Sequence, residues 1–131
     1  MKKWVLVALI AVGLAGCANK PIYNVDNHPI PIAAQKLPLD RIESLIIQAG
    51  QSRNWKFQRS GVGHLIATQT EPKFSATVDI YFTQTNYRII HNSTVGFKEQ
   101  NGTVHPHYNS WIQYLERDIE TYLANANLTA G

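Results

Sequence analysis

The segment 75–82, SATVDIYF, decides the fold class of this chain. Apolar side chains occupy every second position of the segment, and polar or amphipathic ones fill the positions between them. The first set is Ala76, Val78, Ile80 and Phe82, and the second is Ser75, Thr77, Asp79 and Tyr81. Because successive side chains of a strand point to opposite faces of a sheet, this period of two predicts a strand with one buried and one solvated face.

Three more strands are expected next to it. The segments 55–58 and 64–68 show the same alternation, and the sequence GVG at 61–63 between them is typical of a hairpin turn. Polar residues at 83–86 supply another turn before a fourth strand at 87–91. Links this short favour an antiparallel sheet.

Two amphipathic helices flank the strands. Apolar residues recur at spacings of three and four on both sides of the sheet region. They are Leu39, Ile42, Ile46 and Ala49 before it, and Tyr108, Trp111, Ile112, Leu115, Ile119, Tyr122 and Leu123 after it. Asn54 tolerates left-handed geometry and is expected to end the first helix, whereas Pro106 suits the start of the second. The predicted fold is α+β in two layers, with four antiparallel strands and both helices on one face.

Residues 1–17 carry a targeting signal. Lys2 and Lys3 precede an apolar run at 4–14, which is too short to span a membrane. The sequence LAGC at 14–17 then resembles the lipobox of bacterial lipoproteins. That resemblance implies that Cys17 receives a lipid carrying acyl chains such as palmitate, and that cleavage occurs just before it. Two or more acyl chains hold a protein firmly on a membrane.

The mature chain would be nearly neutral. Cleavage before Cys17 removes Lys2 and Lys3, leaves 115 of the 131 residues and lowers the net charge from +3 to +1. A charge of +1 offers no electrostatic footprint for nucleic acid. Ala18 follows the cysteine where an aspartate would resemble the signal for inner-membrane retention. By analogy with enteric bacteria, we expect the protein on the outer membrane, facing the periplasm.

Four regions are expected along the chain. Residues 1–16 form the signal peptide, and 17–37 the lipidated N-terminus and a tether, because prolines interrupt this stretch repeatedly. The globular domain occupies 38–126, and 127–131 form a C-terminal tail. The single cysteine excludes a disulfide framework within the chain and any multi-thiolate metal site.

Residues 38–123 resemble a group of small bacterial lipoproteins and secreted proteins that have no assigned activity. In that group a YN-x-W helix follows a β-meander, and here Tyr108, Asn109 and Trp111 supply the motif after His105. The chain departs from the group by an additional histidine, His107. The resemblance supports the fold and brings no function with it.

Three histidines are the candidates for chemistry. His105 and His107 lie two residues apart, and His91 near a strand end would complete an open three-histidine metal site. A small metal-binding protein or hydrolase using these side chains is therefore the alternative function. Against it, Pro106 separates the pair at a helix start, where His105 is expected to cap the helix while His107 faces solvent. No motif for nucleophilic catalysis or phosphate binding is present, and we expect no cofactor.

The favoured expectation is a non-catalytic interaction module of the bacterial envelope, whose partner is another envelope protein or the cell wall. The uncovered sheet face and the loop 93–104 are the surfaces available for such a contact. The residues predicted to form the interaction surface are Ile66, Asp79, Tyr81, Asn92 and Ser93.

Overall fold

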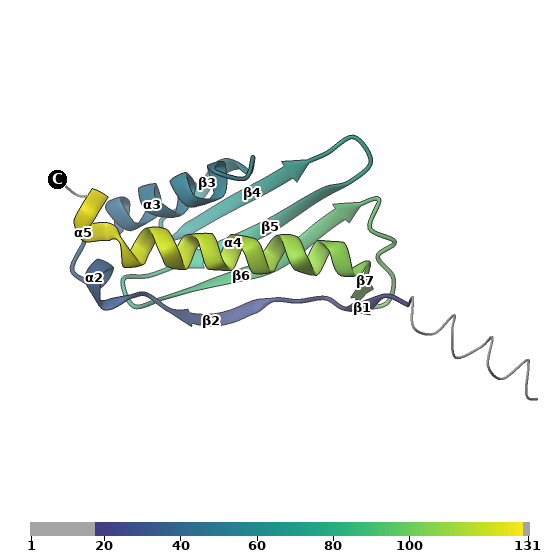
Figure 1. The fold of residues 1–131 in the computed structure, drawn as a ribbon, viewed down its shortest axis with the longest axis horizontal. Helices are drawn as coiled ribbons and strands as arrows, with labels where there is room; N and C mark the ends of the chain where they lie inside the picture. Colours follow the sequence, from purple (N-terminus) through teal and green to yellow (C-terminus); the bar gives the residue numbers. More distant parts are fainter. Residues whose placement is uncertain (1–17, 130–131) are drawn as a thin grey trace, which may run out of the picture.

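The centre of the fold is an antiparallel sheet of five strands in the order β2–β6–β5–β4–β3, seen in a computed structural model that describes residues 18–129 (Figure 1). The strands are β2 Val25–Pro29, β3 Lys56–Gly61, β4 His64–Thr70, β5 Ser75–Phe82 and β6 Asn86–Val95. The segment with the clearest period of two, β5, is the middle strand. Its four apolar side chains are buried, as the alternation predicts.

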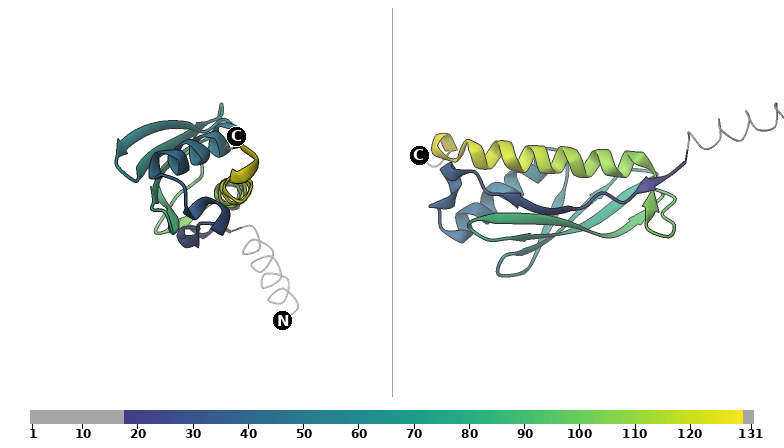
Figure 2. Two further views of the ribbon diagram at one scale, coloured as in Figure 1. Left: turned by 90° about the vertical axis from the view of Figure 1, so that its left-hand side faces the viewer. Right: turned by 90° about the horizontal axis from the view of Figure 1, so that it is seen from below.

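Two helices cover one face of this sheet. They are α3, Leu39–Gln51, and α4, Pro106–Ala124, which lie side by side against the strands (Figure 2). Apolar side chains from both helices and from the sheet form a single buried core. Its members include Ile42, Leu45 and Ile46 of α3, Leu65, Val78 and Ile80 of the sheet, and Ile112, Leu115 and Ile119 of α4. The α+β fold class is therefore confirmed.

The ends of the helices follow local sequence rules. Asn54 adopts a φ of 71° shortly after α3, which is the left-handed geometry expected of it. Pro106 occupies the first turn of α4, where its missing N–H costs nothing. His105 is the N-cap of α4, and its Nδ1 atom accepts a hydrogen bond of 3.0 Å from the backbone N–H of His107. The predicted capping role of His105 is confirmed.

The predicted four-stranded sheet is wrong by one strand. Residues 25–29, placed in the expected tether, form the edge strand β2 and pair with β6 through Val25–Ile89 and His28–Tyr87. The short helix α2, Ile32–Gln35, follows it, and Ile30 and Ala34 on either side of its start are buried. Val25 is the only fully buried residue of β2, and the other residue on the helix side, His28, is polar, so the strand carries almost no apolar alternation of its own. Burial of Ile30 and Ala34, which follow β2 in the chain, therefore helps to hold the strand in place.

The first residues that the structure describes already pair with another part of the fold. A second, two-stranded sheet pairs β1, Lys20–Pro21, with β7, Thr103–Val104. At the other end a last short helix, α5, Ala126–Thr129, takes up most of the expected tail, and Ala126 is buried. The predicted signal segment and the predicted acylation site at Cys17 lie outside the described residues. Within residues 18–129 no helix is long and apolar enough to cross a membrane.

Candidate functional site

The sheet face opposite α3 and α4, called the open face below, carries polar side chains from four strands. In β4 and β5 every second side chain is buried, and the side chains between them point to the open face. The register of the two strands places these side chains next to one another. Three of the predicted surface residues, Ile66, Asp79 and Tyr81, lie here, and Ile66 pairs directly with Asp79. The other residues expected on this face are Lys56, Gln58, His64, Thr68, Ser75 and Thr77.

Asp79 is the centre of a hydrogen-bonded group on the open face. One carboxylate oxygen, Oδ1, lies 2.7 Å from Nε2 of His64 on the neighbouring strand β4. The other, Oδ2, accepts a 3.0 Å hydrogen bond from the side-chain amide of Asn92 on β6. Both oxygens therefore have partners, and three strands contribute to one cluster.

A register shift in β6 brings Asn92 to this cluster. Val78 pairs with His91 and Thr77 with Ser93, so that Asn92 is an extra residue opposite the two consecutive positions of β5. Such a bulge re-aims the side chains next to it. Asn92 consequently reaches Asp79, and Ser93 lies beside Thr77 at the edge of the open face. The structure thus gathers all five predicted surface residues on one side of the sheet.

Tyr81 adds an aromatic surface next to the same cluster. Its ring stacks on the His64 ring with centroids 4.3 Å apart and planes 18° from parallel. The guanidinium carbon of Arg88, which pairs with Tyr81 across β5 and β6, lies 5.4 Å from the centroid of the Tyr81 ring. Tyr81 nevertheless remains 37% exposed. We call His64, Asp79, Tyr81, Arg88 and Asn92 the Asp79 cluster.

The Asp79 cluster contains a His–Asp pair, an arrangement that also occurs in nucleophilic active sites. A His–Asp pair is two-thirds of a nucleophilic triad, but it needs a hydroxyl or thiol in hydrogen-bond contact with the imidazole. Among residues 18–129 no such hydrogen bond to His64 exists. Two hydroxyls on the same face, those of Thr68 and Thr77, lie 3.2 Å from each other. The His64–Asp79 contact joins β4 to β5 on the open face.

The three candidate metal ligands do not form a ligand group. His91 points to the helix side of the sheet, where its Nε2 lies 2.7 Å from Glu99 Oε1 and its ring meets Tyr108 edge-on. His105 is committed to the helix cap, and the ring of His107 is 6.4 Å from it. In the part of the chain that the structure describes, no three His, Cys, Asp or Glu side chains are placed to hold a metal ion.

The pKa of the Glu99 carboxyl group is lowered from its ordinary value. The hydroxyl of Thr94 donates a hydrogen bond of 2.7 Å to Glu99 Oε1, and this bond is the main reason why its pKa is lowered. The contact with His91 lowers the pKa further, whereas partial burial opposes the effect. Glu99 therefore ties the loop after β6 to two residues of that strand.

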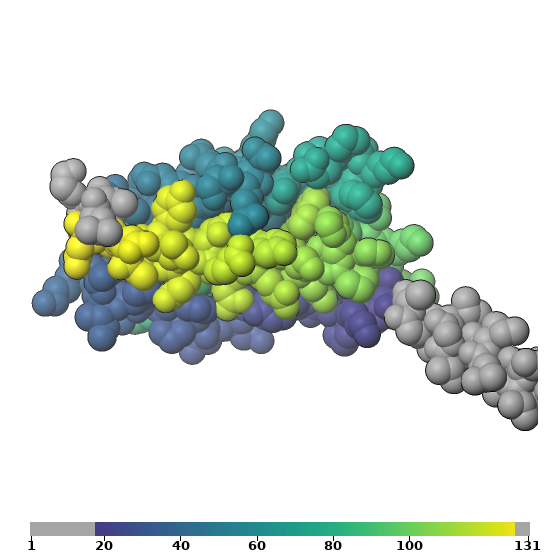
Figure 3. Space-filling view, in the orientation of Figure 1, coloured from purple at the N-terminus to yellow at the C-terminus, as the bar shows by residue number. Residues whose placement is uncertain are grey.

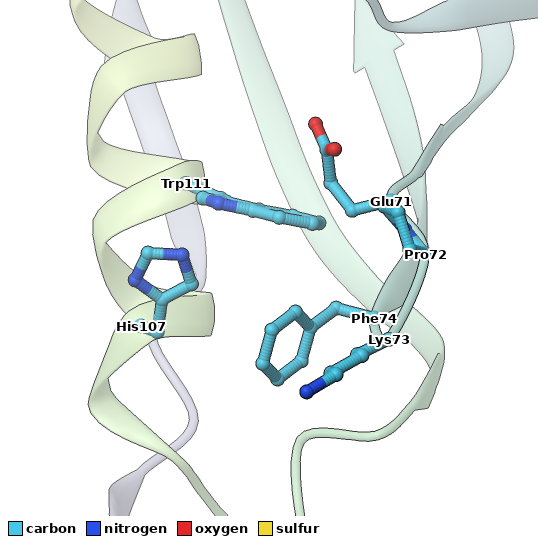
Figure 4. Close-up of a pocket in the computed structure, with 6 residues that line it drawn as sticks. All are labelled: Glu71, Pro72, Lys73, Phe74, His107 and Trp111. Atoms are coloured by element: carbon cyan, nitrogen blue, oxygen red, sulfur yellow. The ribbon is translucent and has the colours of Figure 1, made fainter.

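A groove that the sequence analysis missed lies between α4 and the β4–β5 hairpin. It has a volume of about 430 Å³, and the side chains of His107 and Trp111 point into it from the helix (Figure 4). The opposite wall consists of residues 71–74 of the hairpin, with the ring of Phe74 facing His107 (Figure 4). A second hollow of about 400 Å³ shares His107 and Trp111 and extends to the end of α3 at 52–54. Both volumes fall in the range of small-molecule and peptide sites.

A buried phenylalanine supports the aromatic side of the groove. Phe97, in the loop between β6 and β7, is fully buried and stacks on Phe74 with centroids 5.0 Å apart. It also meets Trp111 edge-on at 4.9 Å, so one ring supports both walls. Phe97 is 23 positions after Phe74 and 14 before Trp111, and neither a period of two nor one of 3.6 relates the three residues. The number of aromatic residues in the second half of the chain was the only sequence signal that could have indicated this groove.

The three residues of the YN-x-W motif have three different structural roles. Tyr108 is buried in the core, and this burial raises its pKa. Asn109 accepts a hydrogen bond from Tyr23 N–H and donates one to Pro21 O, both at 2.9 Å, which fastens the N-terminal segment to α4. Trp111 lines the groove. Trp111 is also partly buried against the core.

The chain was compared with known families, characterised proteins and solved structures. No family model, characterised protein or solved structure matches it.

Proposed function

We propose that this chain is a lipoprotein of the bacterial outer membrane whose periplasmic domain is a non-catalytic interaction module. The lipobox at 14–17 supports the anchor, with Cys17 as the only thiol available for acylation. The resemblance of residues 38–123 to small bacterial lipoproteins points the same way. The domain then serves to hold a partner close to the membrane.

The observation that carries the binding role is the Asp79 cluster. Tyrosine and arginine are enriched in protein interfaces because they offer large contact areas together with hydrogen bonds. Here Tyr81 is half covered by His64 and Arg88, so its ring is held in one orientation before any partner arrives. Preorganised side chains lose little conformational freedom on binding. We propose that a second envelope protein docks on this open face.

Crosslinking in cells tests the docking surface. Asp79→Lys combined with Tyr81→Ala should abolish a crosslinked partner that the wild-type protein captures, and a cooperative thermal transition checks that the variant still folds after losing the contacts of Asp79 with His64 and Asn92. The matched control combines Asp26→Lys with Tyr114→Ala, which removes the same groups from exposed positions elsewhere, and it should crosslink as the wild type does. Normal crosslinking by the Asp79 and Tyr81 variant would place the interface elsewhere.

A second candidate surface is the groove beside Trp111. It is concave and mostly apolar, with Glu71 and Lys73 on its hairpin wall, and therefore suits a short partner segment that inserts an apolar side chain. Photo-crosslinking residues placed at Glu71 and at Thr77 distinguish the two surfaces. A partner captured only from position 77 supports the open face, and one captured only from position 71 supports the groove.

The anchor is tested by one substitution. Cys17→Ser should abolish incorporation of labelled palmitate and leave the signal segment uncleaved by the lipoprotein peptidase. Persistent labelling of that variant would contradict the lipobox interpretation, and so would a wild-type protein recovered entirely in the soluble periplasm.

The alternative metal-binding function predicts stoichiometric zinc in the purified domain, lost in His105→Ala.

A further inference from the structure

Very little chain separates the acylation site from the folded domain. Only Ala18 and Asn19 lie between Cys17 and strand β1, which begins at Lys20. The side-chain amide of Asn19 already donates a 2.7 Å hydrogen bond to Lys98 O, so Asn19 itself belongs to the domain. The long tether expected from the prolines is therefore absent between residue 18 and β1.

This short connection limits how far the domain can stand from a membrane. Three extended residues span at most about 10 Å, which is close to the electrostatic screening length of about 8 Å at physiological ionic strength. With Cys17 acylated, β1 lies within this distance of the lipid headgroups. Charges on the same end of the domain then interact with the membrane surface.

The end concerned, called the anchored end below, consists of β1, the β4–β5 hairpin at 71–74 and the β6–β7 loop at 96–102. Pairing of β1 with β7 and stacking of Phe74 on Phe97 bring these segments together. All of them lie at the right-hand end of the molecule in Figure 1, next to the start of α4. The space-filling view in Figure 3 shows the same segments around that end.

The anchored end presents three lysines to solvent. Lys20, Lys73 and Lys98 are exposed, one from each segment, and none of them forms an ion pair with another described residue. Two acidic residues lie nearby, Glu71 and Glu99, and the carboxylate of Glu99 is hydrogen-bonded by Thr94 and contacted by His91. The three lysines outnumber these two acids by one, so this end carries a small positive net charge of +1.

We propose that the anchored end lies directly on the bilayer, with these lysines against the phosphate groups of anionic phospholipids. A basic side chain close to an anionic membrane is attracted to it. Strand β4 and helix α4 then point away from the surface, and β4, with seven residues, separates the β3–β4 hairpin from the anchored end by about 23 Å along the strand. The inference rests on the proposed acylation of Cys17.

Fluorescence quenching on vesicles tests this orientation. The full-length lipidated protein is reconstituted in vesicles of phosphatidylcholine and phosphatidylglycerol that carry a quencher on the headgroup. A fluorophore is attached through Val95→Cys at the anchored end or through Val62→Cys in the β3–β4 hairpin; these positions are 68% and 79% exposed. The label at 95 should be quenched several-fold more strongly. Equal quenching at both positions would overturn the proposal.

Two further variants separate the lysines from the short connection. Replacing Lys20, Lys73 and Lys98 by Gln should reduce the difference in quenching on anionic vesicles to the value seen on pure phosphatidylcholine. Inserting a Gly-Ser linker after Ala18 should reduce it as well. An unchanged difference in both variants would contradict the proposed contact.

Failure of the anchor gives a different result from failure of the orientation. A protein that does not float with the vesicles contradicts the acylation on which the proposed function rests. A protein that floats with them, and shows equal quenching at the two labels, contradicts only the orientation.

Discussion

The hydroxyl of Tyr23 donates a 2.5 Å hydrogen bond to Oε1 of Glu116, 93 residues further along the chain. This contact fastens the segment between β1 and β2 to the middle of α4. The hydrogen bond, partial burial and the charge of Glu116 together raise the pKa of Tyr23 to about 12. The protonated phenol is thus part of what holds the first described residues to the domain.

Tyr23→Phe should change the stability of the protein in alkali. A raised pKa means that the folded state favours the protonated phenol, so the contact contributes fully below pH 10 and is lost as the pH rises towards 12. Between these values the free energy of unfolding should fall less steeply in Tyr23→Phe than in the wild type, as measured by urea denaturation. Tyr114→Phe, at an exposed ring, should follow the wild type; the same behaviour in Tyr23→Phe would contradict the prediction.

Asn109→Ala should loosen the N-terminal segment without unfolding the domain. The substitution removes both the acceptor for Tyr23 N–H and the donor to Pro21 O, each worth about 1 kcal/mol. Amide hydrogen exchange at 20–25 should accelerate, while exchange in β4 and β5 stays slow. The control is Ser110→Ala, whose hydroxyl contacts only its own helix at Pro106 O. Equal exchange in the two variants would show that Asn109 does not fasten this segment.

Gly96→Ala should be far more damaging than Gly102→Ala. Both glycines have positive φ, 83° and 78°, which costs about 1–2 kcal/mol for a residue with a side chain. At Gly96 a Cβ atom would also lie 2.0 Å from Lys73 O, so the loop and the β4–β5 hairpin would have to separate. At Gly102 nothing lies within 4 Å. Thermal unfolding should show a loss at Gly96 several times that at Gly102, and similar losses would contradict the close approach of the two loops.

Glu99→Gln should reduce the sensitivity of the domain to acid. A lowered pKa means that the folded state favours the carboxylate, so its contribution is complete above the ordinary value of 4.5 and is lost as the pH falls through the lower value. Stability should decline less steeply below pH 4.5 in this variant. Thr94→Val removes the main cause of the shift and should act in the same direction. A variant that declines as steeply as the wild type would exclude Glu99 as the titrating group.

Sequence patterns predicted the strands and helices that bury several apolar side chains at regular spacing. The strand β5 and helix α4 carry many inward positions, so their periods stand out. Val25 is the only fully buried residue of strand β2, and Asp26, Asn27 and Pro29 are poor strand formers. Its position depends on pairing with β6, which lies about 60 residues away, and no local pattern records such a partner.

The candidate surfaces, like the secondary-structure elements, were predictable only where the pattern of one strand or helix determines them. Period two placed Asp79 and Tyr81 on the open face, because it needs only the direction of one strand. The contact from Asn92 depends on a bulge in another strand, and the groove depends on Phe74, Phe97 and Trp111 meeting from three separate elements. Contacts of this kind arise from the tertiary fold.

The pairing of the earliest described residues with the latest strands also bears on the order of folding. Lys20 needs Val104, and Val25 needs Ile89, so the first strands to leave the ribosome are among the last to find their partners. Closing such distant pairs is entropically costly and slow. The five-stranded sheet therefore cannot be completed before β6 has been synthesised, and the two-stranded sheet cannot form before β7 has been synthesised.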